Sequence, residues 1–404
     1  MVNIANKILK DREKKDSIIK KYVDSYQVVS LKANIPGNNK NIKEAYVLVN
    51  IFDKILVRYK PIKRLFYKSY DGPYFIYLFN KDKNLKKEMM KIESSNKLAR
   101  LIDIDVYMDC SHSLNRSNPR TCYLCNQNAL ICARLKKHST KELLDYISKI
   151  TSSYLKKIVK KMINESMLKE LNLHPKFGLV TPYTNGSHKD MDYNLMINAK
   201  NAILDDLVKM FMLGYEQDLP LDKLFKKARF IGIKADKHMF KATSNINAYQ
   251  GLIFNLGLVL VNLGKQLKDN LSINEVYKNI KEMSKSFIKE GNFGARKQAS
   301  EGYQIIQNLL NNNDLSKMNT LDILIYFINN LDDTVLLRRC KDQELLRNIK
   351  EEFKTLDSSK KLLINQINEK CINNNFSFGG CADLLVVSLF IFDFTNTFNK
   401  INHI

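Results

Sequence analysis

The chain has 404 residues, of which 45% are hydrophobic, and it carries a net charge of +23. That length predicts two or three domains, with cores large enough to fold without a disulfide or a structural metal. The ordinary apolar content argues against a disordered chain. The longest apolar runs, 251–263 and 384–394, fall short of the roughly 20 residues that a membrane span requires. We therefore expect them to be buried core helices.

The positive charge is compatible with nucleic acid, a polyphosphate ligand or an acidic protein partner. Residues 1–150 carry +15 and the remainder +8. Lysines spread over solvated helix faces would explain the same balance. The sequence has no run of five like charges and no nucleic-acid-binding motif, so nucleic-acid binding is the minor hypothesis. Seven cysteines, and an N-terminal segment without a signal-peptide core, predict a cytoplasmic protein.

The first 150 residues alternate between helix and strand signals. The expected elements, in chain order, are a helix over 1–30, a turn at Pro36-Gly37, strands over 46–59, 74–79 and 101–108, a loop over 111–126 and a helix over 130–150.

After about residue 150 the strand signals thin out, and apolar residues recur at helical spacing. Glycine- and proline-containing breaks interrupt this pattern at 174–187 and 376–380. We predict an α+β mixed domain over 1–150 and an all-α helical domain over 151–404, joined between 145 and 155 without an obvious flexible linker.

Asp103-Ile104-Asp105 lies on one of the predicted strands, where alternation places both carboxylates on one face. Two such carboxylates can hold Mg²⁺ while substrate phosphates complete its coordination. Arg100, Arg116 and Arg120 flank the pair and add phosphate-binding groups. The alternative is a pair of surface residues at a strand end.

Cys122-x2-Cys125-x6-Cys132-x5-His138 has the ligand types of a structural zinc site, although its six-residue gap is short for the common sites. The alternative is a set of small buried thiols in a turn and a helix.

These motifs belong to a longer pattern that covers most of residues 1–150. Its other parts are Glu93 and the segments 8–13, 34–40, 98–106 and 132–139. Together they resemble the citrate lyase holo-acyl-carrier-protein synthase family, with Ala99 standing where that family has Gly.

The resemblance implies an apo-citrate lyase phosphoribosyl-dephospho-CoA transferase. A serine hydroxyl of the apo acyl-carrier (γ) subunit would attack the α-phosphate of a 5-triphosphoribosyl group, and pyrophosphate would leave. Asp103 and Asp105 would be catalytic and bind Mg²⁺. The residues that would hold phosphates are Lys40, Arg116, Arg120 and Arg134.

The second half contains glycine-bearing loops beside acidic residues, a pattern suited to a metal–polyphosphate site. A loop that includes His188 enters a helix near Asp190 and Asp192. Further acids stand beside turns, in Asp332-Asp333-Thr334 and in Gly379-Gly380-Cys381-Ala382-Asp383. Taken singly, such residues are usually helix caps or turn residues.

Residues 155–390 resemble the triphosphoribosyl-dephospho-CoA synthase family, on these segments and on 175–180, 231–243, 251–257 and 294–296. The resemblance implies a helical enzyme that uses ATP and 3′-dephospho-CoA and releases adenine. His188 would be a general acid or a base, and the choice between these roles stays open. Mg²⁺ candidates are Asp190, Asp192, Asp236, Asp332, Asp333 and Asp383, and phosphate candidates are Lys176, Lys189, Arg296 and Arg338.

The family's Asn-Thr-His-Lys-Gly run appears here as Asn247-Ala248-Tyr249-Gln250-Gly251, without its histidine and lysine. Three hypotheses therefore stand. The chain makes and attaches the citrate lyase prosthetic group, or only its transferase half is active and the helical half is a binding domain, or it is a basic nucleic-acid-binding protein.

Overall fold

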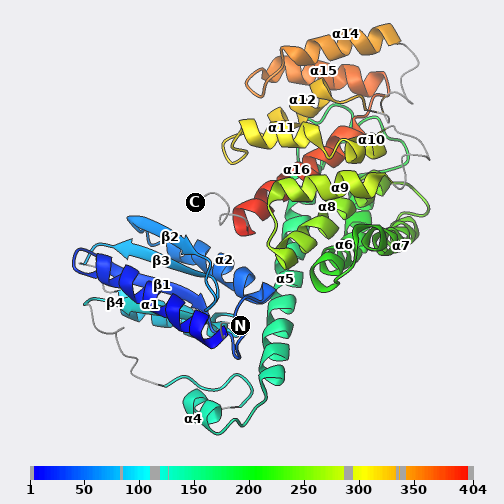
Figure 1. Cartoon of the computed structure of the whole chain (residues 1–404). Coiled ribbons are helices and arrows are strands. Elements are labelled where there is room, and N and C mark those ends of the chain that lie inside the picture. Colours follow the sequence, from blue (N-terminus) through cyan, green and yellow to red (C-terminus); the bar gives the residue numbers. More distant parts are fainter. Residues whose placement is uncertain are drawn as a thin grey trace. The chain divides into compact units, whose positions relative to one another are not determined.

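A computed structural model describes residues 4–81, 85–109, 119–125, 127–285, 294–333, 336 and 343–398. The chain forms two compact units, one of residues 1–155 with 396–404 and the other of residues 156–395. The first contains a small sheet with helices, and the second has no strand among its described residues (Figure 1). The predicted order of a mixed domain followed by a helical one is confirmed.

The first unit is built on a four-stranded antiparallel sheet with the strand order β2-β3-β1-β4. The strands are β1 (Gln27–Ala33), β2 (Lys63–Tyr67), β3 (Tyr74–Phe79) and β4 (Ile102–Tyr107). The helices are α1 (Ile4–Val23), α2 (Lys43–Val57), α3 (Leu85–Ser94), the 3-10 turn η1 (Ala99–Leu101) and α4 (Ala129–Arg134).

Helices cover both faces of this sheet. Ile19 and Val23 of α1 pack against Val28 and Ile76 on one face. On the opposite face Tyr77 donates a hydrogen bond to Asp53 of α2 (2.9 Å). Every residue of β3 is buried because both of its faces are covered, which explains its continuous apolar sequence.

The prediction of a strand over 46–59 is wrong, because this segment is the helix α2. Its β-branched residues favour a strand locally, but Ala45, Leu48, Phe52 and Leu56 recur at helical spacing and are buried. The polar residues between them interrupt any strand alternation. Packing of this helical stripe on the sheet outweighs the local preference.

Two predicted helix boundaries are also wrong. The first helix ends at Val23, and residues 27–33 form the central strand β1, which pairs with two strands distant in sequence. The predicted helix over 130–150 is divided into α4 and α5 (Thr140–Leu171). Lys136 has a φ of 46° after α4, and Ser139 and Glu142 form reciprocal hydrogen bonds that begin α5.

The boundary between the units lies inside α5, which begins in the first unit and ends in the second. In the second unit α6 packs against α7 and α8, with Gly214 and Gly264 permitting close backbone approach. A Cβ at Gly214 would lie 1.9 Å from the carbonyl oxygen of Val261. The other helices are α6 (Tyr193–Glu216), α7 (Leu221–Ala242), α8 (Gln250–Asp269), α9 (Ile273–Ser284), α10 (Ala295–Ser300), α11 (Gln304–Asn312), α12 (Thr320–Asn330), α14 (Gln343–Lys354), α15 (Lys361–Asn373) and α16 (Gly379–Phe398).

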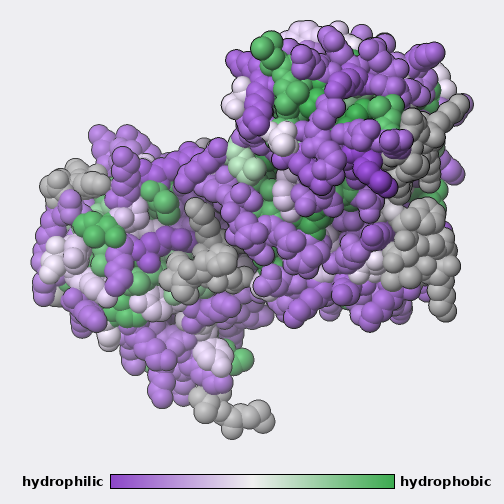
Figure 2. All heavy atoms as spheres, turned by 90° about the horizontal axis from the view of Figure 1, so that it is seen from above, coloured by the Kyte–Doolittle hydropathy of each residue, from purple (hydrophilic) through white to green (hydrophobic). Residues whose placement is uncertain are grey.

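Among the described residues, only α16 is long and apolar enough to cross a membrane. The helix α16 extends beyond the apolar run 384–394 at both ends. Because 67% of its most apolar window is buried inside the protein, it has the character of a core helix. The face in Figure 2 is mostly hydrophilic, with hydrophobic side chains showing between the polar ones.

Candidate functional site

The carboxylate pair of the first unit lies on β4, whose burial alternates so that Asp103 and Asp105 are half-buried between buried apolar residues. The register pairs Asp103 with Lys32 and Asp105 with Ser30 on β1, on the face that α1 covers. Burial raises the pKa of Asp105, and the nearby Asp103 adds to this effect. A divalent cation would relieve this repulsion, so the oxygen donors fit Mg²⁺.

Arg120 connects this pair to Glu93. Its guanidinium lies 2.5 Å from Oδ1 of Asp103 and 2.5 Å from Oε1 of Glu93. Oε1 of Glu93 also accepts a hydrogen bond from the backbone N–H of Ile104 (2.8 Å). Glu93 thereby ties α3 to the outer edge of β4 and places Arg120 beside the predicted metal ligands.

A second charged cluster lies next to the pair and was not predicted. The Asp71 carboxylate contacts Arg12 at 3.1 Å and also contacts Lys32, the residue opposite Asp103. Burial would raise the pKa of Asp71, but its hydrogen bonds to Arg12 and Lys32 bring it below the usual value. Lys40 donates to the carbonyl of Ile35 nearby, and burial lowers the pKa of its amine. No signal in the sequence indicates that Lys32 lies beside Asp103, because that neighbourhood depends on the pairing register of β1 and β4.

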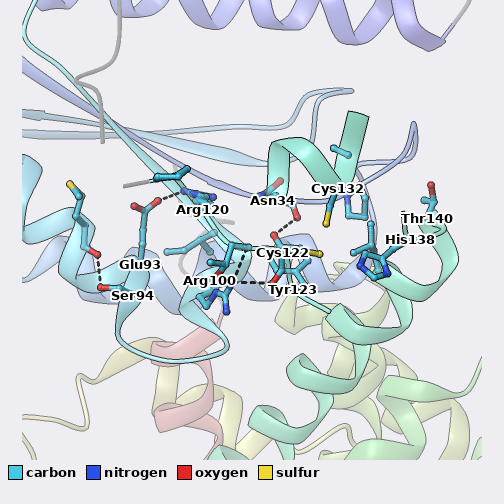
Figure 3. Close-up of a pocket in the computed structure, with 18 of the residues that line it drawn as sticks. Asn34, Glu93, Ser94, Arg100, Arg120, Cys122, Tyr123, Cys132, His138 and Thr140 are labelled. Carbon is cyan, nitrogen blue, oxygen red and sulfur yellow. Dashed lines mark hydrogen bonds and ion pairs between the residues drawn. The ribbon is translucent and has the colours of Figure 1, made fainter. Parts of the chain in front are cut away.

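A cavity of about 1390 Å³ in this unit lies beside Glu93 and Arg120 (Figure 3). Arg100 also lines the cavity, and it donates to the carbonyls of Thr121 (2.8 Å) and Cys122 (3.2 Å). Four lysines line the cavity as well, and their charge would favour a polyanionic ligand. They are Lys86, Lys87, Lys91 and Lys136.

The other predicted groups of this unit are separated from the cavity. Asp103 and Asp105 do not line the cavity. Arg120, which does line it, contacts Asp103 and so connects the carboxylate pair to the cavity. Arg134 is exposed at the end of α4 and does not line it either. Arg116 lies outside the described residues.

Four predicted zinc ligands come together near the same cavity, and we refer to them as the Cys3His cluster. Their ligand atoms all lie within 4.8 Å of one another. Its members are Cys122, Cys125, Cys132 and His138. The hydrogen bond with His138 is the main cause that lowers the pKa of the Cys125 thiol to about 6.

In the helical unit, three of the predicted acids meet around a cavity of about 400 Å³, together with Arg296. Asp333 accepts a hydrogen bond from the backbone N–H of Cys381 (2.9 Å), at the first turn of α16. Burial raises the pKa of Asp383, and the charge of Asp333 raises it further. The three acids are Asp332, Asp333 and Asp383.

An adjoining cavity of about 340 Å³ contains the predicted cation and histidine. Lys176 is fully enclosed and binds the carboxylate of Glu170 at 2.7 Å, and burial lowers the pKa of its amine. His188 Nε2 lies 2.9 Å from the hydroxyl of Ser377. Tyr249 is also buried here, and its hydroxyl has no hydrogen-bond partner among the described residues.

The two cavities share residues at the start of α8 and α16. The shared residues are Asn247, Gln250, Gly251 and Asp383. Residues 248–250, where the sequence departs from the synthase family, therefore line the candidate site directly. Helices α8 and α16 both begin in this region, where Asn247 Oδ1 accepts from the N–H of Gln250 (3.1 Å) and Asp333 accepts from the N–H of Cys381.

The remaining predicted acids of the second half do not line these two cavities. Asp192 caps α6 by accepting from the N–H of Leu195 (2.8 Å), and Asp190 is exposed at 3.9 Å from His188. Asp236 lines an adjoining, more apolar cavity of about 470 Å³, which shares Gln250 and Arg296 with the cavity of the three acids, and burial raises the pKa of its carboxyl. Lys189 is exposed and lines none of these cavities, and Arg338 lies outside the described residues.

Comparison with known proteins divides the chain at the boundary between the two structural units, near residue 155. A family described as apo-citrate lyase phosphoribosyl-dephospho-CoA transferase matches residues 4–154. A second family, described as ATP:dephospho-CoA triphosphoribosyl transferase, matches residues 156–301 and 274–402.

Individual relatives are similar over most of their length. Protein CitXG of Leuconostoc mesenteroides subsp. cremoris is 27% identical over 95% of this chain and 96% of its own. Protein CitXG of Haemophilus influenzae is 29% identical over 77% of each chain. A Haemophilus ducreyi protein named 2-(5''-triphosphoribosyl)-3'-dephosphocoenzyme-A synthase is 26% identical over 66% of this chain and 98% of its own.

Proposed function

The chain belongs to both of these transferase families, joined in tandem, and we propose that it makes the citrate lyase prosthetic group and attaches it to the acyl-carrier subunit. The observation that carries this proposal is the presence, within one chain, of two separate sites that each combine carboxylates with cations. The helical unit would make the substrate that the first unit consumes.

In the helical unit, the 2′-hydroxyl of 3′-dephospho-CoA would attack C1′ of the ATP ribose. The C–O bond forms as the bond to adenine breaks, and adenine leaves with a proton. Asp332, Asp333 and Asp383 would hold Mg²⁺, which neutralises charge on the triphosphate. Arg296 and the start of α16 would bind the triphosphate oxygens. His188, in the adjoining cavity, would exchange a proton with the leaving base or the attacking hydroxyl.

In the first unit, a serine hydroxyl of the acyl carrier would attack the α-phosphate of the triphosphoribosyl group. The new P–O bond makes a phosphodiester, the bond to pyrophosphate breaks, and the serine proton passes to water or to the released pyrophosphate. Asp103 and Asp105 would hold Mg²⁺, which offsets the charge of the polyphosphate. Arg120 would bridge this pair and the lysine-lined cavity. The net charge of +15 over residues 1–150 would favour an acidic carrier protein and a polyanionic substrate.

Release of adenine tests the first step. The purified chain is incubated with ATP, Mg²⁺ and 3′-dephospho-CoA, and adenine is followed by chromatography, with dephospho-CoA omitted as the control. We expect adenine release that depends on dephospho-CoA. A folded chain that releases none, yet modifies the apo carrier when the triphosphoribosyl compound is supplied, would leave only the first unit as an enzyme. The departures at 248–250 favour that alternative, and the assembled acids and Arg296 favour the full activity.

A further inference from the structure

We propose that the Cys3His cluster binds one structural Zn²⁺ ion, which holds the segment 119–139 against the cavity of the first unit. This site is independent of the Mg²⁺ sites above. Zn²⁺ prefers thiolate and imidazole ligands, and a set of three cysteines and one histidine closes its tetrahedral coordination without an open position. Such a closed site stabilises structure and takes no direct part in the reaction.

The distances within the cluster fit one ion at its centre. Sγ of Cys125 lies 3.4 Å from Sγ of Cys132 and 3.3 Å from Nε2 of His138. With Zn–S bonds of about 2.3 Å and Zn–N bonds of about 2.0 Å, tetrahedral geometry gives separations of roughly 3.8 and 3.5 Å between such ligands. The cysteines are free thiols, and 3.4 Å is far longer than the roughly 2.05 Å of an S–S bond.

The backbone brings the ligands together from three places. The first pair lies in a tight turn that is closed by hydrogen bonds from Cys122 N–H to Gln127 (2.7 Å) and from Ala129 N–H to Arg120 (2.8 Å). Asn128 then caps α4, which positions Cys132. After α4 the chain turns back through Lys136, and His138 returns to the turn.

A second observation, independent of these distances, shows that the segment lacks a core of its own. Of its described residues between 119 and 139, only Cys122 and Cys132 are buried. Leu130, Ile131 and Leu135 are 50 to 71% exposed, and α4 is only six residues long. A helix this short is not stable alone. Tyr123 stacks on Tyr146 of α5, but the buried side chains of the segment are themselves thiols, so a metal ion would supply the stability that apolar packing does not.

The ion would also position the transferase machinery. The segment contains Arg120, which contacts Asp103 and Glu93. Arg100 fixes the start of the turn through the carbonyls of Thr121 and Cys122. Loss of the metal would therefore release Arg120 and one wall of the cavity, while the helical unit would be unaffected.

The test measures metal content directly. The full chain is purified with a tag that binds no metal, under reducing conditions, and zinc is measured by mass spectrometry against the protein concentration. We expect about one zinc per chain. Cys125→Ser and His138→Ala should bind much less, while Cys371→Ala, which removes a buried thiol of the helical unit, should keep the full amount. Cobalt(II) bound to the wild-type chain in place of zinc should give the intense absorption of tetrahedral thiolate coordination. This measurement needs no variant, so it holds even if the variants fail to fold.

Three results would overturn the proposal. They are a folded chain with reduced thiols and no zinc, a disulfide between Cys125 and Cys132 in metal-free protein, and cluster variants that keep the metal. The positioning role rests on the proposed function and has its own readout. Cys125→Ser should slow transfer to the carrier at least about 10-fold, with adenine release unchanged. Loss of zinc without slower transfer would remove that role and leave the metal site intact.

Discussion

Gly251 at the start of α8 lies against the buried carboxylate of Asp383 on α16, so closely that a Cβ at position 251 would be 2.2 Å from Oδ2 of Asp383. The start of α8 can approach Asp383 this closely because position 251 has no side chain. The contact also fixes the carboxylate between the two cavities of the helical unit. It connects the packing of two helices to the position of a predicted metal ligand.

Gly251→Ala should therefore displace Asp383. We expect a loss of about 1 to 3 kcal/mol in the free energy of unfolding of the helical unit, since the interior is overpacked. Adenine release should fall by about 100-fold or more, because the metal ligand is misplaced. Gly232→Ala is the matched comparison, since its Cβ would lie at an ordinary contact distance of 3.4 Å from Cε of Met210 and Gly232 lines neither of the two cavities. Equal adenine release by Gly251→Ala and the wild type would remove Asp383 from the site.

Asp103→Asn and Asp105→Asn should each slow transfer to the acyl carrier by at least about 100-fold, because an amide cannot replace a charged Mg²⁺ ligand. Both residues are half-buried on β4, so the fold should survive the change. Mass analysis of the carrier after incubation measures transfer. Adenine release from the same chain serves as the internal control and should stay at the wild-type rate. Full transfer by both variants would refute the metal pair.

Asp71→Asn should change the acid stability of the first unit. The Asp71 carboxyl has a pKa below its usual value of 3.8 when folded, so the unfolded chain binds its proton more readily. Its contribution to stability is therefore present above about pH 4 and is lost as the pH falls through the folded-state pKa.

At pH 7 the Asp71→Asn variant should lose about 1 to 3 kcal/mol, because Arg12 and Lys32 lose a charged hydrogen-bond partner. The difference from the wild type should shrink as the pH falls below about 4. Urea unfolding at several pH values measures both. Asp145→Asn, at an exposed position, should stay within about 0.5 kcal/mol of the wild type throughout. A difference that is constant with pH would show that the interaction is not ionic.

Tyr249→Phe should lower adenine release by about 10-fold while leaving stability unchanged or slightly raised. The Tyr249 hydroxyl is buried in the candidate site without a hydrogen-bond partner among the described residues, so removing it breaks no observed bond. A slower reaction would mean that the substrate uses this hydroxyl.

Tyr303→Phe is its counterpart, because the buried Tyr303 hydroxyl donates to Oδ1 of Asn255 (2.9 Å). This variant should lose about 1 to 2 kcal/mol of stability. Thermal unfolding and adenine release, measured on both variants, separate the two roles. An unchanged rate in Tyr249→Phe would mean that this tyrosine only fills space.

The sequence by itself determined the features that depend on local pattern. The alternation of Ile102 to Tyr107 predicts a strand with both aspartates on one face, and the long helical periodicity after residue 150 predicts an all-helical unit. The resemblance to two families, carried by the motifs, agrees with the two families that match the chain. Each of these signals lies within a window of neighbouring residues, where side-chain spacing is set by backbone geometry.

Only the tertiary structure decided which distant residues meet. It places Lys32 opposite Asp103 and gathers Asp333, Asp383 and Arg296 at one cavity. It puts Asp236 in an adjoining cavity that Arg296 also lines. It also makes a helix of residues 43–57, whose local preference is for a strand. These outcomes depend on strand register and on helix packing, which sum many non-local contacts. No local window of sequence contains that sum, because each contact joins residues that the chain itself keeps far apart.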